Sequence, residues 1–546
     1  MGLEHNQETH PSILDSSTEP LENMEKFPTN RRPLVRQMEE VDVRTVENWV
    51  LSTGATLGPG IPDITRRERV LRLLYTYRDL NATELEHIEP TDLYEHKVRL
   101  KEGVEPWRRS HQRRWPVGQQ HWLQKTIREG LKYGMYERTV LANGELSSWN
   151  AQPVLVPKDK TDPDPWAEMR VTFNYRNIEE NLPGCFLELM SKTHDYLSQP
   201  QHNIFCVFDV KNGYWCIPIF KPHCHYFAFS ISGIGQCQPT RMPQGTRSAG
   251  FSFTEMMYIA FGAIPPLETK SIKNENMHSS LSKSKTGSEP SLISAEAPGT
   301  LPKMTFYIDD IFSGATNFEE MFHFLENHLF PRLACAKLKL SFKKMKLFVH
   351  DVLALGIIHK AGGILQIKED RARLIRAWPI PMSSSDVAAF LGAIGITRRW
   401  VKNFAEISRP LTCLTGKVDW KWESAKQVSF EILREKCSTT VEIFGYEFDQ
   451  PVNLYSDASK FAGGCCITQM RGSSSIEVAT LYDSFIFSPT QINYGTYKRE
   501  LCAIVEFCRK FEYMLRSLSS TSIIWTGHQP IVRFLDSLHH EGIYAR

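Results

Sequence analysis

The sequence predicts a multidomain protein of mixed structure, in which α+β and α/β units follow one another along the chain. Its 546 residues exceed what one hydrophobic core can organise and correspond to about three or four domains. Short strand-like runs alternate with segments of helical periodicity. The hydrophobic fraction of 41% and the charged fraction of 23% are typical of a globular protein.

The N-terminal region gives the weakest structural signal. Residues 1–60 are rich in Glu, Pro, Thr and Ser and show little periodicity, so we expect no packed core there. Apolar residues recur at helical spacing in the segment 66–80, which predicts a short amphipathic helix. Residues 1–95 are therefore predicted to be a largely disordered spacer with one short helix. The apolar face of that helix comprises Val70, Leu71, Leu74 and Tyr77.

A basic stretch that contains several tryptophans lies between Lys97 and Lys132. Such a segment could follow a phosphate backbone while its aromatic rings stack or pack. It could equally be the cationic face of a helix whose tryptophans turn into the core, and both interpretations stay open. Within it, residues 121–133 have helical periodicity. The charged and aromatic members are Lys101, Arg108, Arg109, Arg113, Arg114, Lys125, Arg128, Trp107, Trp115 and Trp122.

Three aspartates stand at the ends or in the middle of strand-like runs. Asp209 closes the run 204–208, and much later Asp309 and Asp310 interrupt the run 305–312. Adjacent ionised Asp side chains repel each other and Asp is depleted from strands, so folding alone does not favour this pair. A divalent cation removes the conflict, and carboxylate oxygens are ligands that suit Mg²⁺.

This pattern predicts a phosphoryl-transfer site. One Asp that closes a strand and an Asp pair at a hairpin turn could hold two metal ions, as an in-line displacement at phosphorus requires. The alternative interpretation of Asp309 and Asp310 is a polar turn, because Asp is a favoured turn residue. The sequence blocks that surround the aspartates favour the metal site.

Two further features lie around these runs. The segments 153–156 and 170–175 alternate in polarity as paired strands do, and the residues between them have the composition of a turn. Residues 266–300 are low in complexity and almost free of large apolar side chains, which predicts a disordered insertion beside the Asp pair. Such a bulge is tolerable because the cost of closing a loop rises slowly with its length.

The C-terminal part predicts strands first and helices afterwards. Strands are expected between 343 and 367, with a tight turn at 361–363. Helices are predicted at 370–378 and 384–404. A new strand-rich unit begins near Pro451.

Five sequence blocks follow one another along the chain: Pro153–Lys158, Arg170–Arg176, Asp209–Trp215, Arg241–Thr246 and Tyr307–Asp310. In this order they resemble the reverse transcriptase of gypsy-type long-terminal-repeat retrotransposons, and the resemblance extends from about His96 to the C-terminus. It implies a right-hand polymerase, with fingers and palm at 96–345 and a thumb/connection at 346–445. A C-terminally truncated RNase H-like domain is expected at 446–546.

The resemblance also implies cofactors and partners. Asp209, Asp309 and Asp310 would bind two Mg²⁺ ions, with Mn²⁺ as an alternative, one at the primer 3′-hydroxyl and the other at the incoming triphosphate. The implied partners are an RNA template, a DNA primer, their RNA–DNA hybrid and deoxynucleoside triphosphates, and no membrane. Asn174 stands where the family commonly has Asp, a departure that we do not expect to abolish the chemistry.

Four other residues match nucleotide-binding positions of the family. Lys158 and Arg170 would face the triphosphate, and Lys160 is a substitute for Lys158. Tyr214 matches the aromatic residue that excludes a ribose 2′-hydroxyl, and Gln244 matches a residue that contacts the nucleotide. Taken singly, each cation could be a solvated surface charge and Tyr214 could be a core aromatic.

A second set of acidic residues resembles an RNase H site that lacks a ligand. Asp457, in the block 455–459, and Glu500, in the block 494–501, match two of its carboxylates. The third is expected at Gly527, which has no oxygen to offer a metal. We therefore predict an RNase H-like fold whose nuclease activity is absent or severely weakened.

The sequence thus predicts an RNA-directed DNA polymerase. The alternatives are a degenerate retroelement remnant that binds nucleic acid without catalysis, or a structural role in a retroelement particle. The formal net charge of +2 argues neither for nor against nucleic acid. Twelve cysteines without metal-ligand spacing, and no secretory signal, favour an intracellular reducing compartment. We expect a cytoplasmic particle, with the nucleus or an organelle left open, and not secretion.

Overall fold

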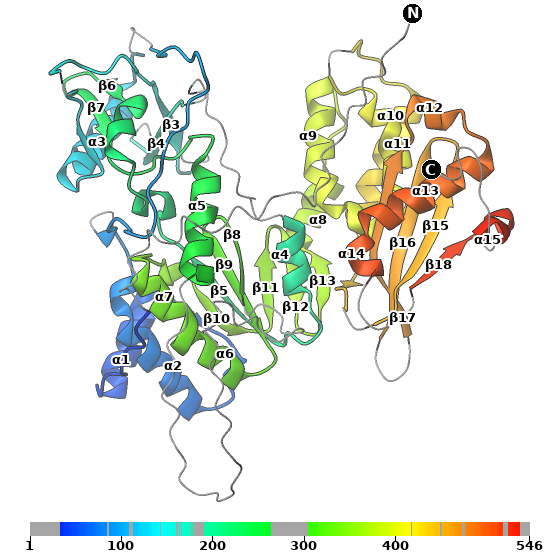
Figure 1. The fold of residues 1–546 in the computed structure, drawn as a ribbon, viewed down its shortest axis with the longest axis horizontal. Coiled ribbons are helices and arrows are strands. Elements are labelled where there is room, and N and C mark those ends of the chain that lie inside the picture. The colour runs from blue at the N-terminus through cyan, green and yellow to red at the C-terminus, as the bar shows by residue number, and fades with distance from the viewer. Residues whose placement is uncertain are drawn as a thin grey trace, which may run out of the picture.

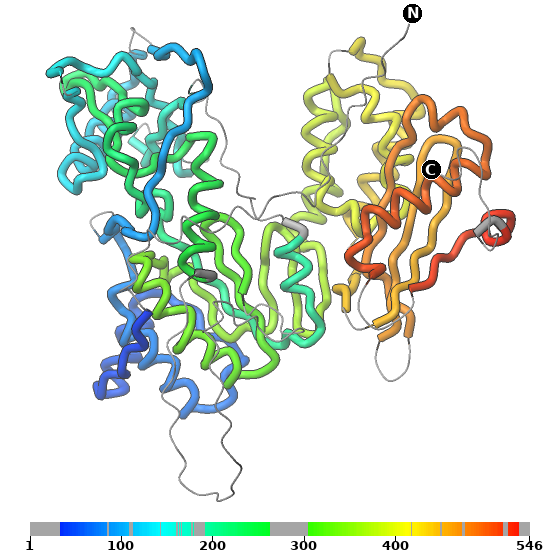
Figure 2. Tube along the Cα trace, viewed as in Figure 1, coloured from blue at the N-terminus to red at the C-terminus, as the bar shows by residue number. Residues whose placement is uncertain are grey.

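In the computed structural model, most elements before residue 350 lie on one side of the molecule, and the elements of residues 384–535 lie on the other (Figures 1 and 2). The predicted insertion at 266–300, Lys160 and the two chain ends lie outside the described residues. The structure describes residues 33–535 except for 85–86, 109–112, 142, 160–161, 163, 165, 176–177, 179–189, 264–303, 417, 440, 448–449, 472–475 and 517–521.

The palm is a five-stranded sheet with the strand order β1-β10-β5-β9-β8. β9 lies between β5 and β8 and runs antiparallel to both, and β5 also pairs with β10. The apolar residues of β5 other than Val207 are buried, and helices cover the sheet (Figure 1). The strands are β5 (Ile204–Asp209), β8 (Met304–Tyr307), β9 (Asp310–Ala315) and β10 (Lys346–Val349), and the helices are α5 (Ala249–Tyr258), α6 (Phe318–Phe324) and α7 (Phe330–Cys335).

The described part of the N-terminal region is packed against the palm, which corrects the expectation of no core before residue 60. α1 (Val43–Thr53) buries Val46 and Val50, and β1 (Thr56–Leu57) adds a parallel strand beside β10. The sequence missed this unit because α1 has only two buried residues and β1 is two residues long. β1 is too short to show a period, and the helical spacing of Val43, Val46 and Val50 in α1 was overlooked within a segment of polar composition.

The predicted helix at 66–80 is confirmed by α2 (Ile64–Thr76). Its predicted apolar residues, among them Val70 and Leu74, are buried in the main core. On its outer side, Arg69 forms an ion pair of 2.9 Å with Glu319 of α6. α2 is therefore held to the palm by both apolar packing and charge.

We predict that Gly58→Ala destabilises the palm. The backbone of Gly58 donates a 2.7 Å hydrogen bond to the Leu347 carbonyl, and a Cβ at this position would lie 2.5 Å from the Phe348 carbonyl oxygen. Because this neighbour is a backbone atom, the clash can be relieved only if the backbone around Gly58 moves. This movement should lower the free energy of unfolding by about 1–3 kcal/mol. Thermal unfolding should show a lower midpoint. Gly392→Ala is the control, since its Cβ would meet no described atom within 4 Å; equal midpoints for both variants would contradict the prediction.

The fingers combine a helix, a hairpin and a small sheet (Figure 1). The predicted helix at 121–133 is confirmed, although it begins earlier, as α3 (Val117–Lys132). The two predicted strands are confirmed as the antiparallel hairpin of β3 (Pro153–Pro157) and β4 (Met169–Phe173). A three-stranded sheet comprises β2 (Tyr136–Arg138), β7 (Gly235–Pro239) and β6 (Phe229–Ile231).

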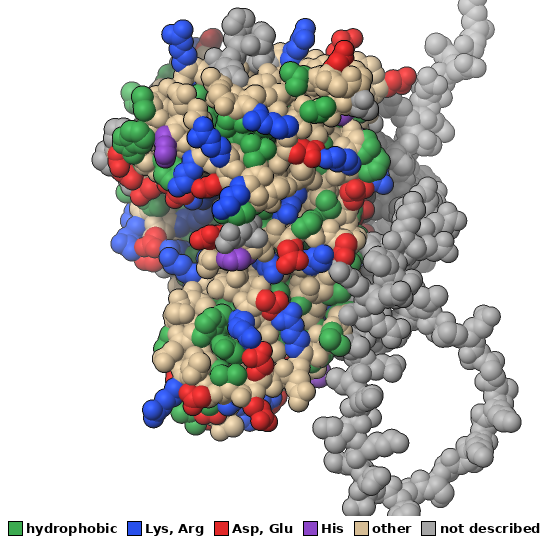
Figure 3. Space-filling model, turned by 90° about the vertical axis from the view of Figure 1, so that its left-hand side faces the viewer, with side chains coloured by type: hydrophobic (Ala, Val, Ile, Leu, Met, Phe, Trp, Pro, Cys, Tyr) green, Lys and Arg blue, Asp and Glu red, His purple; other side chains and the backbone are tan. Residues whose placement is uncertain are grey.

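The basic stretch has its tryptophans half-buried and its cations at the surface. Trp107 and Trp115 pack against the main core, and the Arg113 guanidinium lies 4.6 Å from the centre of the Trp115 ring. Packing of these tryptophans agrees with the second interpretation of the stretch, while a phosphate-binding role stays a prediction. Figure 3 shows Lys and Arg interspersed with Asp and Glu over the face that it presents, as the small net charge implies.

A four-stranded sheet and four helices follow the palm. The predicted turn at 361–363 joins β12 to β13, and Gly362 and Gly363 both have positive φ. α4 precedes β5 in the chain and lies beside this sheet (Figure 1). The elements are α4 (Met190–Leu197), β11 (Asp351–Ala354), β12 (Ile357–Lys360), β13 (Ile364–Ile367), β14 (Ile443–Phe444), α8 (Glu369–Arg376), α9 (Ser384–Ile394), α10 (Phe404–Thr412) and α11 (Ser424–Lys436).

The helix predicted at 384–404 is confirmed only for its first half, because the α-helix ends ten residues before the predicted end. α9 ends at Ile394, a 3₁₀ helix spans Gly395–Trp400, and α10 begins at Phe404. Asn403 adopts a left-handed φ of 58°, which redirects the backbone before α10. Asn tolerates this conformation better than most residues, and the apolar periodicity gave no sign of it.

The C-terminal unit is a four-stranded sheet of order β17-β16-β15-β18 with α13 against it. Cys465 and Cys466 face opposite sides of β16, as neighbours in a strand must, and only Cys465 is fully buried. The elements are β15 (Asn453–Ala458), β16 (Ala462–Arg471), β17 (Ile476–Ile486), β18 (Ile523–Thr526), α12 (Pro489–Ile492), α13 (Thr496–Lys510), α14 (Glu512–Leu515) and α15 (Gln529–Leu535). No helix in the described ranges is long and apolar enough to cross a membrane.

Candidate active site

The three predicted aspartates come together at one end of the palm sheet. Asp209 is the last residue of β5 and lies directly opposite Asp310, the first residue of β9. Asp309 lies in the turn between β8 and β9, and its carbonyl accepts a 2.7 Å hydrogen bond from the Val210 backbone. Strand register thus brings residues that are far apart in sequence to the same point.

The turn that carries Asp309 is strained. Ile308 has a φ of 53°, a left-handed conformation that β-branched residues rarely adopt. Strain of this kind persists only where the surrounding structure enforces it, and it is concentrated at functional sites. Here the antiparallel pairing on both sides of the turn, Tyr307 with Asp310 and Asp209 with Asp310, holds it in place.

The site concentrates negative charge in a partly buried place. Burial, and then the neighbouring Asp209 and Asp310, raise the pKa of Asp309 to about 7. Burial and Asp209 likewise raise the pKa of Asp310. The Asp309 Oδ1 atom is buried and has no hydrogen-bond partner among the described residues. Such an arrangement is unfavourable unless a cation compensates it.

One cation already approaches the site. The Lys344 ammonium lies 2.8 Å from the Asp209 Oδ2 atom, and the Lys344 side chain is 66% exposed. An exposed ion pair of this kind contributes little stability and is easily exchanged. Sequence analysis missed Lys344, because a lysine next to Lys343 in a basic segment carries no signal that distinguishes it.

The three aspartates have the oxygen ligands that a divalent cation needs, although their side chains are not arranged in a metal-binding geometry. Within the parts of the chain that the structure describes, no three His, Cys, Asp or Glu side chains stand as a group that could hold a metal ion. The orphaned Asp309 oxygen and the hard carboxylate donors are nevertheless what Mg²⁺ requires.

We predict that Asp309→Asn stabilises the metal-free protein more strongly at high pH. Because the folded pKa of about 7 exceeds the ordinary value of 3.8, the folded state holds the proton more tightly. Stability of the wild type therefore falls as the pH rises through that window, and the penalty is complete above it. Thermal unfolding in a chelator at about pH 5 and about pH 8 should give a larger gain for the variant at the higher pH. Equal gains at both pH values would contradict the assignment.

The other predicted site residues are distributed between the palm and the fingers. Tyr214 lies in the 3₁₀ helix Gly213–Cys216 that follows β5, where Asp309 contributes to the raised pKa of its hydroxyl. Lys158 and Arg170 belong to the fingers hairpin, and Lys158 forms an ion pair with Glu168. Exposed Gln244 precedes Gly245, whose Cβ position lies 3.1 Å from the Phe173 carbonyl oxygen at the end of β4.

The structure therefore brings Tyr214 to the aspartates and leaves the two cations on a separate element. Because Lys158 is paired with Glu168, the Lys158 side chain must leave Glu168 before it can bind a phosphate. The roles of Lys158, Arg170 and Gln244 stay predictions.

The second predicted site also assembles, at the end of β15. Asp457 lies on β15, next to β18 in parallel register, and raises the pKa of Glu500 after the larger effect of burial. Glu500, on α13, is 8% exposed, and its Oε2 atom has no partner in the described structure. Gly527 follows β18 and lines, with Asp457, a hollow of about 740 Å³. Its Cβ position would meet no described atom within 4 Å, so an Asp there is sterically permitted.

Comparisons with known families agree with this two-part organisation. Residues 167–359 match the family of reverse transcriptases (RNA-dependent DNA polymerases). Residues 422–523 match the RNase H-like domain found in reverse transcriptase. The first match contains all three palm aspartates, and the second contains Asp457 and Glu500.

The similar curated proteins are Pol polyproteins of retroelements. The Pol polyprotein of transposon 412 from Drosophila melanogaster is 26% identical over 78% of this chain and 31% of its own length. That of transposon 297 from the same fly is 25% identical over 86% of this chain and 39% of its own length. The transposon Tf2-3 polyprotein of Schizosaccharomyces pombe is 21% identical over 76% and 28%, respectively. The chain thus spans roughly a third of the length of these relatives, and the matches confirm the predicted resemblance.

Solved structures confirm the fold. The foamy viral protease-reverse transcriptase in complex with double-stranded DNA superposes with a TM-score of 0.67 at 18% identity, covering 94% of this chain and 95% of that one. The same viral protein in complex with an RNA/DNA hybrid gives a TM-score of 0.65 and covers 91% and 59%. The right-hand polymerase fold followed by an RNase H-like domain is therefore the architecture of this chain.

Proposed function

We propose that this chain, which contains the reverse transcriptase and RNase H-like domains of a retroelement Pol polyprotein, is an RNA-directed DNA polymerase of a gypsy-type retrotransposon. The observation that carries the proposal is the pairing of Asp209 with Asp310 across two strands, with the orphaned carboxylate of Asp309 in the adjoining turn.

The residues have separable tasks in the proposed reaction. Asp209, Asp309 and Asp310 would hold two Mg²⁺ ions, or Mn²⁺ in their place. When bound, these ions supply the charge that activates a primer 3′-hydroxyl and neutralises the triphosphate and its leaving pyrophosphate. The three carboxylates would orient the reacting groups. Lys344 would release Asp209 when a cation binds there. Tyr214 closes the nucleotide site beside Asp309, where a flat ring leaves no room for a 2′-hydroxyl.

The proposed partners are an RNA template, a DNA primer and deoxynucleoside triphosphates. The foamy viral neighbour was solved with double-stranded DNA and with an RNA/DNA hybrid, which supports a nucleic-acid duplex as the ligand here. Free thiols throughout the described residues suit a reducing compartment, and we propose a cytoplasmic particle. The RNase H-like domain is proposed to be inactive or nearly so, because Gly527 replaces a metal ligand.

Primer extension tests the proposal. A labelled DNA primer on an RNA template should be extended by the wild type with Mg²⁺ and deoxynucleotides, and not in a chelator. Binding of the primer–template without extension under any divalent cation would instead favour a degenerate remnant that has kept the fold and lost catalysis.

A further inference from the structure

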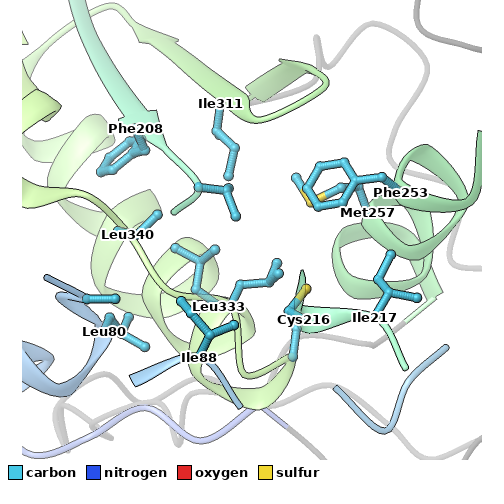
Figure 4. Packing of buried hydrophobic residues seen from close by; sticks show 14 of the residues in the cluster. Leu80, Ile88, Phe208, Cys216, Ile217, Phe253, Met257, Ile311, Leu333 and Leu340 are labelled. Carbon is cyan, nitrogen blue, oxygen red and sulfur yellow. The ribbon is translucent and has the colours of Figure 1, made fainter. Parts of the chain in front are cut away.

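The ring of Phe253 is fixed against the residue that we expect to select the sugar. Phe253 lies on α5, is 0% exposed and belongs to the main core. Its ring centre lies 5.5 Å from that of Tyr214, and the two ring planes meet at 70° in an edge-to-face contact. Figure 4 shows Phe253 with Met257 in the same buried cluster as Ile311 and Cys216.

Phe253 also holds the backbone that presents Tyr214. A Cβ at Gly213 would lie 2.5 Å from one atom of the Phe253 ring and 2.8 Å from another. It would lie 3.0 Å from the Asp309 Oδ1 atom on its other side. A side chain at Gly213 would therefore require the Phe253 ring or the Asp309 side chain to shift. The preceding Asn212 has a φ of 50°, so the whole turn is in a constrained conformation.

The Phe253 ring is one of the contacts that limit the position of the Tyr214 ring. The edge of the Tyr214 ring rests on Phe253, and the residue as a whole is half-buried. If the Phe253 ring were smaller, Tyr214 would settle into the space that it leaves.

We propose that Phe253 is a positioning residue: it fixes the place of the Tyr214 ring relative to the incoming sugar and thereby sets the discrimination against ribonucleotides. This inference rests on the proposed function. If the Tyr214 ring moves away from the incoming sugar, space opens beside C2′, and a 2′-hydroxyl that is otherwise excluded can fit there. Phe253 does not touch the nucleotide, and its whole effect passes through Tyr214.

The test is steady-state incorporation of one deoxynucleotide, or of the matching ribonucleotide, by wild type and Phe253→Leu. We expect the ratio of kcat/KM for the deoxynucleotide to that for the ribonucleotide to fall by about tenfold or more. Most of the change should come from a lower KM for the ribonucleotide, with kcat for the deoxynucleotide nearly kept. Phe253→Met, which conserves more volume, should give a smaller fall in the same direction.

A double-mutant cycle separates positioning from general damage. In a Tyr214→Ala background, Phe253→Leu should change the sugar ratio no further, because the ring that it positions is absent. Phe322→Leu is the matched core control, since Phe322 is 1% exposed and stacks on Phe318 in the separate helix α6. It should lower thermal stability without changing the ratio.

Three results would overturn the inference. One is an unchanged ratio in both Phe253 variants; a second is an equal fall in Phe322→Leu; the third is a further fall when Phe253→Leu is added to Tyr214→Ala. Absence of any wild-type extension would refute the proposed function itself, and this inference with it. Normal wild-type extension with an unmoved ratio would refute only the role of Phe253.

Discussion

Asp309→Asn is expected to reduce primer extension on an RNA template by at least about a thousandfold, which corresponds to roughly 4 kcal/mol of transition-state stabilisation. Asn keeps the shape of the side chain but loses the negative charge that a metal ion requires. Because the Asp309 Oδ1 atom is buried and unpartnered, its loss as a ligand has no structural substitute among the described residues. Single-turnover extension at saturating primer–template measures the chemical step directly.

The fold of this variant should be intact, which makes the loss interpretable. Removing a buried charge relieves repulsion, so its thermal stability should equal or exceed that of the wild type. Asp351→Asn is the matched control, since Asp351 is an exposed residue of β11 outside the palm sheet. Substantial extension by Asp309→Asn, or an equal loss in the control, would contradict the assignment.

Gly527→Asp is expected to raise cleavage of the RNA strand in an RNA–DNA hybrid from background to at least about a hundredfold above it, or roughly 2.7 kcal/mol. The substitution supplies the third carboxylate beside Asp457 and Glu500 that two-metal cleavage requires. Open space at the Gly527 Cβ and a backbone outside the left-handed region allow an Asp there without strain. The orphaned Glu500 oxygen would then share a cation with it.

Two further variants make the gain specific. Asp457→Asn added to Gly527→Asp should return cleavage to background, because the site again lacks a ligand. Gly392→Asp adds a carboxylate at another open glycine and should leave cleavage unchanged. If Gly527→Asp folds, binds hybrid and still does not cleave, the loss of activity has a cause other than Gly527.

The three palm aspartates could be predicted from the sequence because their charges are costly without a partner, whereas Asp457 and Glu500 were expected from the resemblance of their sequence blocks to RNase H. A doubled Asp in a strand, or an Asp that closes one, needs a reason that composition does not supply. The sequence did not specify the strand register. The pairing of β5 with β9 in the structure places Asp209 opposite Asp310. Helices such as α2 and α3 could be predicted because their apolar spacing extends over 13 and 16 residues, whereas the order of the domains was expected from the family resemblance.

Other features depend on contacts that the sequence does not encode locally. β1 is two residues long and is a strand only because β10 lies beside it. The break at Asn403 depends on one backbone conformation inside an apolar segment. Lys344 and Phe253 act through proximity to Asp209 and Tyr214, and only the folded chain reveals which of many lysines and phenylalanines lies there.

The central claim is that Asp209, Asp309 and Asp310 share a pair of cations, and electron paramagnetic resonance of bound Mn²⁺ tests it most directly. With primer–template and a non-reactive deoxynucleotide, the account predicts two magnetically coupled ions per chain, about 4 Å apart, that Asp309→Asn abolishes. An uncoupled spectrum, or the same coupled pair in wild type and Asp309→Asn, would contradict it.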